Sequence, residues 1–224
     1  MASTRSPIGA GIYSPVEAAS LVRASARAVR RWTFGPRPSF RNSAPETGER
    51  CLSFLDLVRV LAIRSLRVEP YKLSLPKIKA CVDFLEREVK IDDPLARNIR
   101  LGRFSGRLLA WVGDRWIGAE RGDFGQEHVT PIVQPYVEHI TFGGPGGVAS
   151  RWTFMQGSGA SIEVDPTIRL GEPVLQPYGL SAREVAISVR AEGGIDRAAL
   201  LHGVTPGAAS LAIDFLDSIE RPAA

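Results

Sequence analysis

A short stretch near the N-terminus, residues 13 to 32, constrains the fold more than any other part of the chain. Apolar residues recur there at helical spacing, the pattern breaks just before Ser25, and it then resumes. Ser14 and Ser25 stand where the two helices would begin and can act as N-caps, and Glu17 completes a capping box for the first. The stretch therefore predicts two short helices joined by a tight turn, each with one buried face.

The second of these helices would expose only basic side chains. Arg27, Arg30 and Arg31 fall on its outer side, with no acidic residue among them. An arginine-bearing helix that follows a tight turn fits the DNA major groove and its flanking phosphates. We therefore predict that these three arginines contact DNA, with Ser25 at the leading end of the helix. The alternative is a structural helix pair whose arginines are merely solvated.

Charge is distributed unevenly along the chain. Residues 1 to 41 hold seven arginines and one acid, a balance of +6, whereas the whole chain carries +4, so the remainder is −2. Residues 161 to 224 hold five arginines and nine acids. Concentrated positive charge is typical of nucleic-acid binding, and an acidic end would repel phosphate. The N-terminal end is thus predicted to bind DNA and the C-terminal end to bind protein.

Between residues 33 and 51 the sequence is rich in Pro, Gly and Ser and does not favour a helix. It is either a loop or small hairpin beside the second helix or a linker. In the first case Arg37 and Arg41 would contact phosphate. Two longer amphipathic helices follow, one from Cys51 to Arg67 and one opening at Ser74.

Several residues in this region together resemble the opening of MerR-type regulators. Those that match are Tyr13-Ser14, Glu17-Ala18-Ala19, Leu21, Ser25, Arg27, Val29-Arg30 and Trp32. The resemblance covers about residues 11 to 90 and implies a winged helix-turn-helix domain that binds DNA as a dimer. The sequence departs from the family at Arg23, where the family usually has a turn glycine, and we expect a cost of about 1 kcal/mol if Arg23 adopts a positive φ.

The middle region, residues 91 to 157, has a different character. Residues 107 to 112 and 115 to 117 flank Gly113-Asp114, which predicts a β-hairpin. A connecting helix is predicted over residues 126 to 142, and a further strand near 149 to 155.

Residues 161 to 220 predict a short strand and then three short helices. Ser181 caps the first helix, Gly193-Gly194 ends it, Asp196 begins the second, and Thr205 begins the third. The runs VDPTIRLGEPVL, GLSAREVAISVRAEGGID and HGVT resemble the C-terminal part of VapB-type antitoxins with a MerR-like N-terminus. The resemblance implies a homeodomain-like trihelical unit that binds a PIN-like endoribonuclease toxin. The residues predicted to bind this partner are Arg183, Leu211, Phe215, Leu216 and Ile219.

Together these observations predict a mainly α protein with a small β component (α+β). The predicted function is an antitoxin that also represses its own operon by binding operator DNA, as a homodimer and in a complex with its toxin. The rival hypothesis is a MerR-like regulator that responds to a small molecule and has no toxin partner.

No enzyme motif, metal site or cofactor site is predicted. Of the histidines, His128 and His139 would lie about 16 Å apart on one helix, too far to share a metal ion. No apolar run is long enough to span a membrane, and the N-terminus lacks the apolar core of a signal peptide, so a cytoplasmic location is expected.

Overall fold

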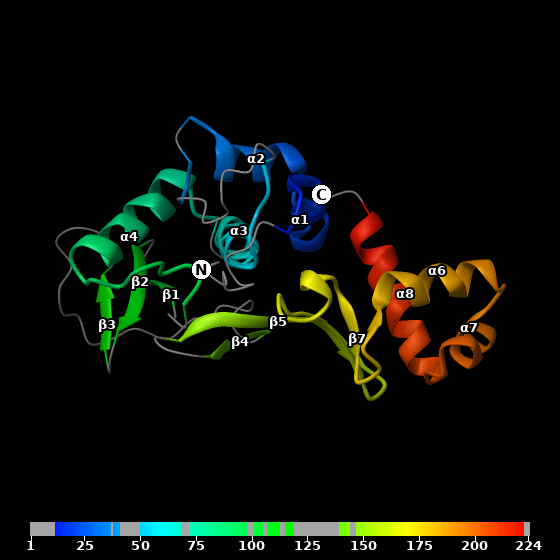
Figure 1. Cartoon of the computed structure of the whole chain (residues 1–224). Helices are drawn as coiled ribbons and strands as arrows, with labels where there is room; N and C mark the ends of the chain where they lie inside the picture. The colour runs from blue at the N-terminus through cyan, green and yellow to red at the C-terminus, as the bar shows by residue number, and fades with distance from the viewer. Residues whose placement is uncertain are drawn as a thin grey trace, which may run out of the picture.

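The computed structural model describes residues 12–36, 38–40, 50–68, 72–97, 139–143 and 147–221, and the backbone of three strands within 101–118 (Figure 1). Its described residues form seven α-helices and two antiparallel sheets, of three and five strands. The protein is therefore a mixed α+β structure in which helices predominate, as the sequence predicted at this level.

Four helices form the N-terminal part: α1 (Pro15–Val22), α2 (Ala26–Phe34), α3 (Phe54–Arg67) and α4 (Leu75–Arg87). The predicted capping box of α1 is present, since the Ser14 hydroxyl accepts from the Glu17 amide at 3.2 Å and the Glu17 carboxylate accepts from the Ser14 amide at 2.8 Å. Ser53 and Asp56 form the same motif at the start of α3. Both α1 and α2 pack against α3, which is the buried centre of this part.

The strands form two separate antiparallel sheets. The first consists of β1 (Leu101–Phe104), β2 (Arg107–Val112) and β3 (Arg115–Gly118), and the second of β4 (Ile140–Gly143), β5 (Val148–Gly157), β6 (Ala160–Val164), β7 (Val174–Gln176) and β8 (Leu180–Ser181). Strands β2 and β3 pair as the predicted hairpin requires, with Trp111 opposite Trp116. The predicted turn at positions 113 and 114 lies outside the described residues.

The prediction of a connecting helix over residues 126 to 142 is wrong for the C-terminal end of that range. Ile140 to Gly143 form strand β4, because β-branched and aromatic side chains such as Ile140, Thr141 and Phe142 favour extended backbone next to a partner strand. Residues 126 to 138 lie outside the described part. The domain boundary expected between 157 and 161 falls at the turn between β5 and β6, so one sheet continues across it.

Three helices close the chain: α6 (Ala182–Ala191), α7 (Ile195–His202) and α8 (Pro206–Glu220). The predicted caps are in place, because the hydroxyls of Ser181 and Thr205 accept from the amides three residues on. Helix α8 packs against α6 and α7 and also against strands β5 and β6. In that contact the rings of Phe154 and Phe215 meet edge to face at 5.1 Å. The trihelical unit is thus anchored on the five-stranded sheet.

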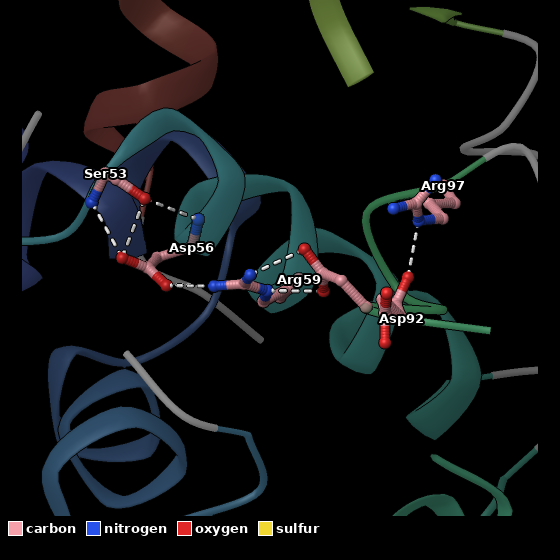
Figure 2. Close-up of polar contacts among 6 residues, drawn as sticks. Ser53, Asp56, Arg59, Asp92 and Arg97 are labelled. Atoms are coloured by element: carbon pink, nitrogen blue, oxygen red, sulfur yellow. Dashed lines mark hydrogen bonds and ion pairs between the residues drawn. The ribbon is translucent and has the colours of Figure 1, made fainter. Parts of the chain in front are cut away.

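A buried ion-pair network joins α3 to the segment that follows α4 (Figure 2). Arg59 is 7% exposed, and its guanidinium contacts the fully buried Asp56 at 2.5 Å and donates from Nε to Asp93 at 2.7 Å. Burial lowers the pKa of Arg59, but the hydrogen bonds and charges of Asp93 and Asp56 outweigh it and raise the pKa overall. Arg59 therefore stays charged inside the fold.

Among the described residues, no single helix is long and apolar enough to cross a membrane. Taken together, α7 and α8 are long and apolar enough, but the chain bends by 109° between them.

We expect Arg59→Met to lower the free energy of unfolding by about 3–5 kcal/mol, because it leaves buried Asp56 and half-buried Asp93 without their cation. Chemical denaturation would measure this loss. Arg87→Met on the exposed side of α4 is the matched control and should change stability by less than about 0.5 kcal/mol. Equal stability of the two variants would show that the network is not needed for folding.

Candidate nucleic-acid interface

Helix α2 presents two different faces. Val29 and Trp32 are buried, at 0% and 3% exposed, and fix the helix against the core. Its N-terminus is capped by Ser25, whose hydroxyl accepts from the Ala28 amide at 3.2 Å. The predicted DNA contact Ser25 is exposed and already serves as this cap. The helix therefore lies with a defined rotation, and the opposite face is directed to solvent.

The outward face of α2 carries Arg27, Arg30 and Arg31, all three exposed. The side chains of these three arginines form no hydrogen bond or ion pair with another described residue, and α2 itself contains no acid. Exposed cations without neighbouring carboxylates produce a local positive potential that attracts polyanions. The structure thus brings the three predicted arginines together on one accessible surface.

The turn between α1 and α2 depends on an unusual residue. Arg23 adopts the left-handed conformation, with φ 53° and ψ 52°, at the C-terminal cap of α1. The backbone carbonyl of Arg23 accepts a hydrogen bond from Nε of Arg64 on α3 at 3.0 Å. The condition stated for this position, a positive φ at Arg23, is met, and α3 holds the turn in place despite the steric cost.

Further cations flank α2 from distant parts of the sequence. Arg31 and Lys79 line a cavity of about 610 Å³ between the end of α2 and the start of α4, and Nζ of Lys79 donates to the Pro38 carbonyl at 3.4 Å. The guanidinium of Arg50 lies 5.9 Å from the centre of the Phe34 ring. The sequence analysis missed Lys79 and Arg50, since more than 15 residues separate each from α2 and no local pattern relates them to it. The predicted phosphate contacts Arg37 and Arg41 lie outside the described residues.

Three of the five residues predicted to bind a protein partner are buried in this chain. Leu211, Phe215 and Leu216 are 8%, 1% and 1% exposed, because α8 packs against the sheet and the other two C-terminal helices. Ile219 is half-buried and Arg183 is exposed. The exposed large apolar residues of the described C-terminal part are Leu170, Ile187, Leu200 and Leu201. An apolar helix face identified from sequence does not reveal whether the same chain or another one covers it.

The described histidines take no part in a metal centre. Nε2 of His202 lies 2.8 Å from the hydroxyl of Ser188, which joins α7 to α6. No group of three or more His, Cys, Asp or Glu side chains in the described ranges could hold a metal ion. His128 lies outside those ranges.

The fold is similar to that of a solved protein that it covers almost completely. The crystal structure of Rv2018 from Mycobacterium tuberculosis superposes with a TM-score of 0.64, covering 94% of this chain and 98% of that chain, at 20% sequence identity. Likeness at this identity establishes the fold alone. No protein-family model and no curated protein matches the sequence.

Replacing Arg23 with glycine is expected to raise the free energy of unfolding by about 1 kcal/mol, because glycine adopts the left-handed conformation without steric strain. The hydrogen bond from Arg64 is kept, since it uses the backbone carbonyl. Arg23→Ala, which keeps the Cβ, is the control and should give no such gain. Thermal and chemical unfolding of the three proteins would measure the difference, and equal gains for both variants would contradict the explanation.

Proposed function

We propose that this protein is a DNA-binding antitoxin that represses its own operon and neutralises a PIN-like endoribonuclease. One observation carries the DNA-binding part: α2 presents Arg27, Arg30 and Arg31 to solvent on one face, without a described acidic partner. Three exposed cations on one face, on a helix that contains no acid, attract a polyanion. The arrangement favours contact with phosphates and base edges.

The N-terminal part is proposed to act as a MerR-like winged helix-turn-helix. Helix α2 would enter the major groove with its N-terminal end, and α1 would cross the backbone. Lys79 and Arg50 lie at the other end of α2, where they can contact the phosphates on either side of the groove. Two subunits would bind two half-sites, because the recognition surface of one subunit covers only one turn of DNA.

The C-terminal helices are proposed to form a homeodomain-like unit that holds the nuclease and excludes its RNA. Acidic residues outnumber basic ones here, and α8 carries acids but no basic residue, which disfavours a second DNA contact. The exposed Leu170, which lies before these helices, favours a protein partner. The sheet packs beneath α8 and supports the unit, which favours a preformed partner surface.

The double variant Arg30→Ala, Arg31→Ala is expected to weaken binding to DNA from upstream of the gene. Two lost phosphate contacts should reduce the slope of log affinity against log salt concentration by about 1.8. Fluorescence anisotropy across a salt series would measure both quantities. Arg197→Ala on α7 is the matched control and should leave affinity and slope unchanged. Unchanged binding by the double variant would remove α2 from the DNA interface.

Co-expression tests the neutralising role. When a PIN-like protein encoded beside this gene arrests growth, the full-length chain is expected to restore growth and to co-purify with that protein. The Arg30→Ala, Arg31→Ala variant should restore growth equally well, because it alters only the DNA-binding surface. Cutting the chain at Gly157 would remove β6 to β8 from the sheet, so intact chains are used. Persistent growth arrest with the full-length chain would contradict the proposal.

A further inference from the structure

A cavity of about 550 Å³ lies between α1 and α8. At these two helices the N-terminal and C-terminal parts of the chain meet (Figure 1). Leu21, Phe215 and Ile219 are among the apolar residues that line it. Val16 and Leu170 stand at its rim and are 53% and 77% exposed. We call this surface the α1–α8 cavity. It combines buried apolar lining residues with exposed apolar anchors and charged groups, as protein-binding surfaces do.

The turn that presents Leu170 is strained. Arg169, Leu170 and Gly171 all have positive φ, at 45°, 55° and 79°. Glycine tolerates this conformation, whereas arginine and leucine each incur a cost of about 1 kcal/mol or more. Because Leu170 stays exposed, burial of its side chain does not offset the strain, so this residue does not stabilise the fold of this chain. Strain of this kind is concentrated at functional sites, where the surrounding structure holds it in place.

Two sets of contacts hold the strained turn. The buried hydroxyl of Tyr13 donates to the Gly171 carbonyl at 2.8 Å, and a Cβ on Gly171 would lie 2.3 Å from that hydroxyl. Burial, followed by the charges of Asp165 and Glu17, raises the pKa of Tyr13, so the donor keeps its proton. Arg169 pairs with Glu172 at 3.1 Å and with Glu184 at 3.3 Å. The position of Leu170 is therefore fixed from both sides.

Each charged side chain that lines the cavity, except one, forms an ion pair or hydrogen bond with a described residue. Arg169 is paired as above, and Glu220 pairs with Arg190 at 2.8 Å. The Glu17 carboxylate caps α1 through the Ser14 amide. Arg183, which also lines the cavity, has no partner among the described residues. An occupant that covers this surface would have to supply a carboxylate to Arg183 to avoid burying an unpaired charge.

We infer that the α1–α8 cavity is the docking site for the nuclease, with Val16 and Leu170 as apolar anchors and Arg183 paired with an acidic residue of the nuclease. This inference rests on the proposed function. A second copy of the chain fits less well, because in a symmetric contact the carboxylate for Arg183 would have to come from this same surface. The carboxylates that such a copy would offer, those of Glu17, Glu172 and Glu220, are already engaged.

The test is the affinity of the purified full-length chain for the adjacent PIN-like protein, measured by isothermal titration calorimetry. Leu170→Asp and Arg183→Glu are expected to weaken binding by about 30-fold and 10-fold, the size expected for interface hot spots. Leu200→Asp is the matched control, since Leu200 is 86% exposed on α7 away from the cavity, and it should stay within about twofold of wild type. Aspartate tolerates a positive φ better than leucine, so Leu170→Asp should fold normally, and retained DNA binding checks this.

The outcomes separate the inference from the proposed function. If the wild-type chain does not bind the PIN-like protein, the nuclease-binding part of the proposed function fails, and the inference fails with it. If wild type binds and Leu170→Asp binds equally well, only the inference is overturned. Loss of binding in Leu200→Asp instead would place the docking site on α7. A smaller mass for Leu170→Asp in light scattering, with unchanged nuclease affinity, would assign the surface to a second copy and also overturn the inference.

Discussion

The N-terminal part of this protein depends on a charge buried at its centre. Arg59 on α3 satisfies Asp56 within its own helix and Asp93 beyond α4, and its guanidinium also lies 5.4 Å from the centre of the Phe40 ring. Asp93 has a positive φ of 56°, which the paired carboxylate helps to hold. One side chain thus joins α3, the segment after α4 and the segment after α2. Because α1 and α2 pack on α3, the network stabilises the helix that supports the arginine-bearing one.

The two ends of the molecule are connected through backbone as well as side chains. The Ala149 amide at the start of the five-stranded sheet donates to the Ala96 carbonyl at 2.9 Å, and Tyr13 reaches Gly171 from the other side. Helix α8 also contacts α1 directly. A partner held at the C-terminal helices would therefore lie beside the helix pair that is proposed to bind DNA, and the two proposed activities share one connected framework.

Local patterns predicted the helices well and the sheets only in part. The N-caps Ser14, Ser25, Ser181 and Thr205 and the left-handed Arg23 are short-range features, whose physics involves only the next three or four residues. Strand β4 was mistaken for the end of a helix because its identity depends on pairing with β5. Strand β1 and the extent of the second sheet were missed for the same reason.

The sequence by itself determined which residues face outward on α2. In a short amphipathic helix, burial of Val29 and Trp32 on one face directs the arginines on the opposite face to solvent. It also determined the separation of basic and acidic ends. Only the tertiary structure decided that Phe215 belongs to the core and Leu170 to the surface. Burial of an apolar side chain depends on which distant element covers it, and neither composition nor helical spacing carries that information.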